Sequence, residues 1–173
     1  MIYILIFILM LTALGVSFLV EYFSKRTLSV IMWTIIGAMV LVAASKPGTS
    51  VSDYNNYLDI FINYDSPKYE LLTEPTYIWL SSFIHGFGGS IRAIFVVYAL
   101  ISIPLKLYIC KKLSSFEVFF TGLPVYLAFF FTLHDTEQIR IAAALSFILM
   151  SYYMYIKGMR WQWLPLYVVA ILF

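Results

Sequence analysis

The sequence predicts an all-α membrane protein, a bundle of transmembrane helices in a single domain. Of its 173 residues, 62% are hydrophobic and 12% are charged, whereas a soluble domain is about half apolar and about a quarter charged. The apolar residues are gathered in long runs, and most charges lie between these runs. Together these observations exclude a water-soluble enzyme domain. The net charge of +2 is small and scattered, which argues against nucleic-acid binding.

Five apolar runs have about the length that a bilayer core requires, roughly 20 residues. They cover residues 2–20, 28–44, 91–110, 116–133 and 139–156. The first run lacks a basic leader and a small-residue cleavage site, so we expect a spanning helix and not a removed signal peptide. A sixth run begins near residue 161 and is still apolar at residue 173. We therefore expect this chain to be the N-terminal part of a longer multi-span protein.

Residues 74–89 form a shorter predicted helix. Thr73 is a suitable cap, Glu74-Pro75 suits a first turn, and the Gly-Phe-Gly-Gly run at 86–89 is a strong stop signal. At about 1.5 Å per residue the apolar part is too short for a comfortable crossing. We expect this helix to be re-entrant or interfacial.

The distribution of basic residues favours that arrangement. If residues 74–89 crossed the membrane, the basic ends of the flanking helices would lie on opposite sides, against the positive-inside rule. If they do not cross, the N-terminus is outside and seven basic residues face the cytoplasm: Lys25, Arg26, Lys106, Lys111, Lys112, Lys157 and Arg160. Four basic residues (Lys46, Lys68, Arg92 and Arg140) then lie outside. Most acids also lie outside: Asp53, Asp59, Asp65, Glu70, Glu74, Asp135 and Glu137.

The predicted external loop, residues 46–73, holds a short amphipathic helix. Tyr54, Tyr57, Leu58 and Phe61 repeat at helical spacing, and we expect this aromatic face to lie in the lipid headgroups. Asp53 is then either a solvated acid beside a membrane anchor or a site residue at the membrane surface.

Several external charges have both a structural and a functional interpretation. Lys46 is either an interfacial lysine in a turn or a point charge for phosphate. Glu74 suits the positive end of a helix dipole, so capping alone can explain it. Arg140 is less easily explained, because the dipole disfavours a cation near a helix N-terminus. It either pairs with Glu137 and reaches the headgroups or binds a phosphate group bidentately.

Two further residues, Arg92 and His134, lie at predicted outer helix ends and join the substrate-binding candidates. With a single cysteine and two histidines, neither a disulfide nor a zinc cluster can be assembled. We expect no metal and no cofactor.

The order of these residues resembles the EpsG family, membrane proteins of the Wzy type in bacterial exopolysaccharide, capsule and O-antigen biosynthesis. The resemblance rests on Gly48 followed by Asp53-Tyr54 and Tyr57, on Glu74-Pro75 with Leu80, on the aromatic run 129–131, and on Ile139-Arg140 with Ala143. It covers the N-terminal half of a typical member. Two departures are visible: the family usually has an arginine where Lys46 stands and a glutamine where Ile141 stands.

The resemblance implies a membrane glycosyltransferase, a polysaccharide polymerase of the bacterial cytoplasmic (inner) membrane. Its substrates would be oligosaccharide repeat units on polyprenyl pyrophosphate, and its partners membrane lipids, a flippase and a chain-length regulator. Arg140 would stabilise the pyrophosphate leaving group, with Arg92 and Lys46 next in order, and Asp53 or Glu74 would act as base. Tyr54 and Tyr57 would stack on sugars or anchor the loop.

Two other functions remain open. A transporter or flippase of lipid-linked oligosaccharide would carry charges or broken helices near the midplane of the membrane, and Pro104 and Pro124 are predicted to break their helices. A non-catalytic scaffold of an envelope assembly complex would tolerate alanine at Asp53, Glu74 and Arg140 together.

Overall fold

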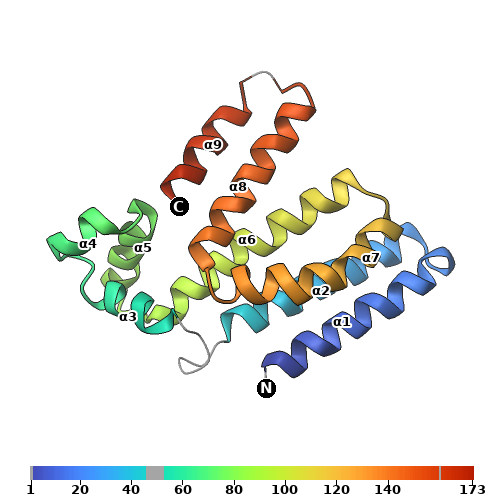
Figure 1. The fold of residues 1–173 in the computed structure, drawn as a ribbon, viewed down its shortest axis with the longest axis horizontal. Coiled ribbons are helices and arrows are strands. Elements are labelled where there is room, and N and C mark those ends of the chain that lie inside the picture. Colours follow the sequence, from blue (N-terminus) through green and yellow to red (C-terminus); the bar gives the residue numbers. More distant parts are fainter. Residues whose placement is uncertain (1, 46–52, 160) are drawn as a thin grey trace.

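The computed structural model describes residues 2–45, 53–159 and 161–173, and it confirms the all-α fold. Within these residues every regular element is helical, and five helices are long and apolar enough to cross a membrane. The chain is thus a multi-pass membrane protein. Figure 1 shows the long helices side by side, with a group of short helices at one end.

The first two helices form a hairpin. Helix α1 (Ile2–Leu19) continues into a short 3-10 turn, η1 (Val20–Tyr22), and α2 is Lys25–Ala44. Helix α2 begins almost one turn before the apolar run, because the Ser24 hydroxyl accepts a hydrogen bond from the Thr27 amide at 3.1 Å. Helix α1 packs against α7 and α2 against α6. Their shared core contains Met39, Ile103, Phe120 and Leu127, all fully buried.

The third and fourth long helices contain the least expected backbone feature. Helix α6 (Ile91–Leu113) runs straight through Pro104, which therefore does not break it. Helix α7 (Phe116–Val125) contains Pro124 and passes directly into a π-helix, η2 (Tyr126–Asp135). Because proline has no amide hydrogen, each of these helices lacks one backbone hydrogen bond at its proline. The wider turn is visible in the hydrogen bond from the Thr136 amide to the Phe131 carbonyl, 3.0 Å over five residues.

The polar segment folds into three short helices, α3 (Tyr54–Ile62), α4 (Pro67–Leu72) and α5 (Pro75–Gly86). They lie beside the beginning of α6 (Figure 1). Thr73 does not cap α5 as predicted. It ends α4, and Glu74 takes the N-cap position of α5, because Pro75 fits the first helical residue.

The predicted stop at the end of α5 is confirmed. Gly88 has a φ of +66°, which only glycine adopts without strain, and the Gly89 amide donates to the Ile84 carbonyl at 2.9 Å. A Cβ at Gly89 would lie 2.7 Å from Ile84 Cγ2 and 3.2 Å from its carbonyl oxygen. The turn therefore leaves no room for a side chain at this position.

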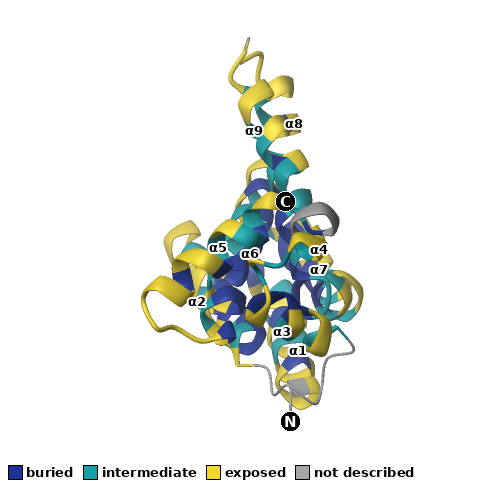
Figure 2. Ribbon diagram, turned by 90° about the vertical axis from the view of Figure 1, so that its left-hand side faces the viewer, coloured by how far each residue is buried: buried dark blue, intermediate teal, exposed yellow. Residues whose placement is uncertain are grey.

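The last two helices, α8 (Ile139–Ile156) and α9 (Trp163–Leu172), pair as a second hairpin. Helix α8 packs on α6. The parts of α8 and α9 farthest from the bundle project away from it, and their residues are mostly exposed or half-exposed (Figure 2). Helix α8 begins after Gln138, which is its N-cap residue.

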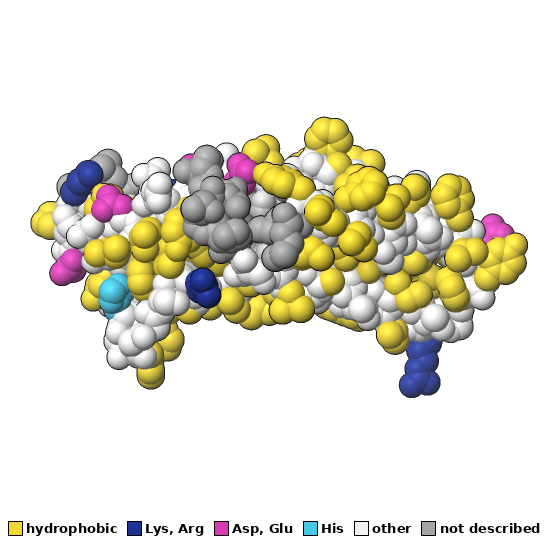
Figure 3. Space-filling view, turned by 90° about the horizontal axis from the view of Figure 1, so that it is seen from below, with side chains coloured by type: hydrophobic (Ala, Val, Ile, Leu, Met, Phe, Trp, Pro, Cys, Tyr) yellow, Lys and Arg dark blue, Asp and Glu magenta, His cyan; other side chains and the backbone are white. Residues whose placement is uncertain are grey.

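Charged side chains are few on the face shown in Figure 3. Hydrophobic side chains are spread along the whole of it, and the charges gather mainly near α3–α5 and at the opposite end. Exposed apolar side chains on the long helices include Phe18, Val30 and Leu100, as expected of surfaces that face lipid.

One part of the charge count is wrong. Lys106 was assigned to the cytoplasmic side and Asp135 to the outside, but the two form an ion pair with an Nζ–Oδ1 distance of 2.5 Å. Both are buried, at 5% and 1% exposure. Both residues were assigned to a membrane surface because they lie near the ends of apolar runs. Each instead lies inside the bundle, where it has the other as its partner. The remaining basic residues still favour the predicted orientation, which stays a prediction.

Candidate functional site

The centre of the candidate site is an ion pair between residues 66 positions apart in the sequence. Arg140 Nη1 donates to Glu74 Oε2. Glu74 is the N-cap residue of α5, and Arg140 lies in the first turn of α8. The pairing of Arg140 with Glu137, one of the two sequence interpretations, is therefore not what the structure contains. The Arg140 side chain is 25% exposed and that of Glu74 37%, so the pair is open to solvent on one side.

Two tyrosine rings flank the guanidinium group. The Arg140 Cζ atom lies 5.4 Å from the ring centroid of Tyr57 and 5.8 Å from that of Tyr77. These distances are typical of cation–π contacts. The two rings stack on each other at 5.7 Å, and the Tyr77 hydroxyl donates to the Tyr57 carbonyl at 2.9 Å. The cation is thus held between a carboxylate and two aromatic faces.

Both tyrosines remain neutral phenols at physiological pH. Burial raises the pKa of Tyr57, and the positive charge of Arg140 opposes that rise. Burial likewise raises the pKa of Tyr77, with smaller contributions from neighbouring tyrosines. Neither phenol can serve as a base under ordinary conditions. Proton acceptance at this site would therefore fall to a carboxylate.

A further carboxylate is that of Asp53, the N-cap residue of α3, whose side chain makes no capping hydrogen bond. The Tyr57 amide donates to the Asp53 carbonyl at 3.0 Å, so Asp53 lies one helical turn before Tyr57. The charge of Asp53 also contributes to the raised pKa of Tyr57. Asp53 is half-buried. The structure thus brings Arg140, Glu74, Tyr57 and Asp53 into one neighbourhood from three separate helices.

The other predicted residues have different surroundings. Tyr54 stacks on Phe95 of α6 at 5.8 Å, and the ring of Tyr57 meets the same phenylalanine edge-on at 5.9 Å. Arg92 is exposed at the start of α6 and forms no ion pair with any described residue. His134, near the end of η2, has its Nδ1 atom 3.0 Å from Oε1 of Gln138, the N-cap residue of α8. Lys46 lies outside the described residues.

The aromatic face of α3 does not lie in lipid headgroups as expected. Tyr57, Ile60 and Phe61 are 3%, 7% and 5% exposed, and they share a core with residues of α5 and α6. The periodicity predicted the helix correctly, but another aromatic surface of the same protein, including Tyr77, competes with lipid for that face.

Tyr77 is a site residue that was not predicted from the sequence. A signal for it was present, because Tyr77 follows Glu74 by three residues, and positions i and i+3 of a helix lie on one face. Once Glu74 is a candidate, an aromatic residue one turn later is its natural neighbour.

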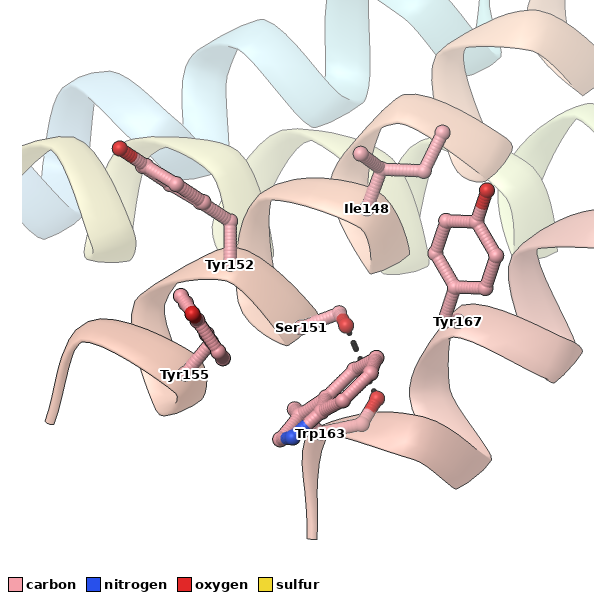
Figure 4. A pocket seen from close by; sticks show the side chains of 6 residues that line it. All are labelled: Ile148, Ser151, Tyr152, Tyr155, Trp163 and Tyr167. Atoms are coloured by element: carbon pink, nitrogen blue, oxygen red, sulfur yellow. Dashed lines mark hydrogen bonds between the residues drawn. The ribbon is translucent and has the colours of Figure 1, made fainter. Parts of the chain in front are cut away.

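Two cavities among the described residues lie outside the Arg140 cluster. A cavity of about 380 Å³ lies between α5 and α6, beside Tyr98, whose ring is 6.1 Å from that of Tyr77. Another, of about 320 Å³, lies in the α8–α9 hairpin. Figure 4 shows its aromatic lining of Tyr152, Tyr155, Trp163 and Tyr167, and the 2.8 Å hydrogen bond from Ser151 to the Trp163 carbonyl. Among the described residues no group of three or more acids, histidines or cysteines could hold a metal.

A comparison with models of protein families shows to which family the chain belongs. The model of the EpsG family matches residues 29–173. The chain belongs to the EpsG family. The match extends from within α2 to the last residue of the sequence, so it includes every residue of the Arg140 cluster. This membership makes the chain a membrane protein of polysaccharide biosynthesis, in agreement with its apolar helices. Neither a curated protein nor a solved structure matches the chain.

Proposed function

We propose that this EpsG-family chain contributes the outer-face site of a polysaccharide polymerase in the bacterial cytoplasmic membrane. Its substrates would be oligosaccharide repeat units carried on polyprenyl pyrophosphate. The observation that carries the proposal is the Arg140 cluster: a guanidinium that is held by Glu74 and two tyrosine rings yet remains a quarter exposed. Family membership supports the polysaccharide part of the proposal.

The proposed reaction transfers the growing glycan from its pyrophosphate carrier to a sugar hydroxyl of the next unit. The bond between the anomeric carbon and the pyrophosphate oxygen breaks, and a new glycosidic bond forms. Negative charge then develops on the departing pyrophosphate, so a fixed cation lowers the barrier. Arg140 supplies this cation, and its planar donors match phosphate oxygens.

The acceptor hydroxyl has to lose its proton, and Asp53 is the better candidate for the base. Glu74 already accepts a hydrogen bond from Arg140, whereas the Asp53 carboxylate makes no capping hydrogen bond. Tyr57 and Tyr77 hold the cation, and Tyr54 stays a candidate for sugar stacking. The proposal places all of these residues at the outer face, next to a flippase that supplies units and a regulator that sets chain length.

A glycan ladder tests the proposal. Cells that lack the full-length gene are complemented with the wild type, with Arg140→Ala or with Arg26→Ala, at matched membrane levels. Arg26 is the matched control, because it is an exposed arginine at the second residue of α2, as Arg140 is the second residue of α8, and it belongs to no candidate site. We expect the ladder to collapse to single capped units with Arg140→Ala, and to persist with Arg26→Ala. A normal ladder with Arg140→Ala would overturn the proposal.

A flippase is the second candidate, favoured by the buried Lys106–Asp135 pair, since charges inside a membrane often mark transport pathways. The same gel separates the two functions. Loss of a flippase leaves no repeat unit outside, whereas loss of a polymerase leaves single units attached to their acceptor.

A further inference from the structure

The ion pair in the bundle interior is part of a larger polar network centred on Asp135. Its Oδ1 accepts hydrogen bonds from Lys106 Nζ at 2.5 Å and from Ser102 Oγ at 2.9 Å. Its other oxygen accepts one from the Tyr126 hydroxyl. Ser102 and Lys106 are four residues apart on α6, so they share one face of that helix. Asp135 thus ties the end of η2 to the middle of α6.

The π-helix makes this network possible. Tyr126 and Asp135 are nine residues apart, which in an α-helix of 3.6 residues per turn is 2.5 turns and places them on opposite faces. In the wider π-helix the same nine residues span about two turns, so both side chains face α6. The unusual backbone therefore has a consequence for side-chain placement, and π-helical segments are often found at functional sites.

The chain between Asp135 and Arg140 is held by hydrogen bonds at successive points. The Thr136 amide donates to the Phe131 carbonyl at 3.0 Å, and the Gln138 amide donates to the Leu133 carbonyl at 3.2 Å. The Thr136 hydroxyl donates to the Thr132 carbonyl at 2.6 Å. Helix α8 begins at Ile139, immediately before Arg140. A displacement of Asp135 would thus be passed to the start of α8.

We propose that Asp135, together with Lys106, is a positioning residue for Arg140. It fixes the η2–α8 junction on α6 and thereby sets the guanidinium against Glu74, Tyr57 and Tyr77. Asp135 itself is 1% exposed and acts on the reaction through Arg140 alone. The catalytic consequence rests on the proposed function, whereas the geometric one does not.

Spin labels test the geometric part on the purified protein in lipid nanodiscs. Cys110 is the single cysteine, so Cys110→Ser gives a clean background for labels at Trp79→Cys on α5 and Ile141→Cys on α8. Both positions are exposed, at 63% and 48%. We expect one narrow distance distribution in the otherwise unmodified protein and a shifted or broadened one with Asp135→Asn. We expect the narrow distribution to return with Lys106→Met/Asp135→Asn, in which no charge is left unpaired.

The control is Glu117→Gln, which removes an exposed acid at the far end of α7 and is expected to leave the distribution unchanged. If Asp135→Asn does not fold, Ser102→Ala removes a single donor to the same carboxylate and answers the question. An unchanged distribution in whichever of these variants folds would overturn the proposal, since a purely stabilising role predicts easier unfolding without movement of α8. A glycan ladder that survives Arg140→Ala would refute the polymerase while leaving the label result valid.

Discussion

The Lys106–Asp135 pair makes a sharp prediction about stability. The two side chains are 6% and 0% exposed, so removal of one partner leaves a buried charge without its opposite charge. Such a change costs about 3–5 kcal/mol. We therefore expect Asp135→Asn and Lys106→Met each to destabilise the fold by about this amount. At roughly 2–4 °C per kcal/mol for a chain of this size, the melting temperature falls by about 6–20 °C.

The double variant is the informative one. Lys106→Met/Asp135→Asn removes both charges, and the asparagine oxygen still accepts hydrogen bonds from Ser102 and Tyr126. Because a buried ion pair is often no more stabilising than a neutral pair of similar volume, we expect the double variant to lose only about 0–2 kcal/mol. The coupling free energy, from a double-mutant cycle, is then about 4–10 kcal/mol.

Thermal unfolding in detergent, followed by loss of the monomer peak in size-exclusion chromatography, measures this cycle. Glu117→Gln serves as the reference for removal of an exposed acid and is expected to change stability by less than about 0.5 kcal/mol. Additive losses in the double variant would refute the reasoning, because they would mean that the two charges do not compensate each other.

Three further outcomes are expected. Tyr77→Phe removes the hydrogen bond to the Tyr57 carbonyl and lowers unfolding free energy by about 0.5–1.5 kcal/mol, measured by the same thermal assay. Gly89→Ala places a Cβ 2.7 Å from Ile84 Cγ2 and costs about 1–3 kcal/mol; Gly86→Ala, in open space, is its control. The pKa of Tyr57 is raised in the folded state, so the unfolded state releases the proton first and stability falls as the pH rises above about 10. Tyr57→Phe flattens that fall in alkaline melting curves, and an unchanged slope would contradict it.

Much of the fold follows from patterns that are local in the sequence. The five spans were predicted because a helix that crosses a bilayer requires a long apolar run. The end of α5 was predicted because the glycines near residue 88 allow a turn that other residues would adopt only with strain. Glu74 and Arg140 were both candidates, since each is a charge beside an apolar helix. Their pairing was not predicted, because a contact between residues 66 positions apart depends on how α5 and α8 pack.

The π-helix shows where such reasoning fails. Nothing in residues 126–135 separates a π-helix from an α-helix by composition. Pro124 indicated a broken helix, whereas the chain passes just after it from an α-helix directly into a π-helix. The wide turns are accompanied by contacts between Asp135 and two residues of α6, which become visible only when both helices are placed. The assignment of Lys106 to the membrane surface failed for the same reason, since hydropathy does not register an acid on another helix.

The Glu74–Arg140 pair also bears on which ligands the site can accept. One edge of the guanidinium already donates to Glu74. An anion that binds Arg140 would therefore compete with the Glu74 carboxylate for hydrogen bonds and would be repelled by its negative charge. A singly charged anion gains little over the partner already present, whereas a group with several phosphate oxygens can engage the donors that remain free on the guanidinium. Under the proposed function, Glu74 would therefore set an affinity threshold that discriminates by charge, and its removal would make the site less selective among anions.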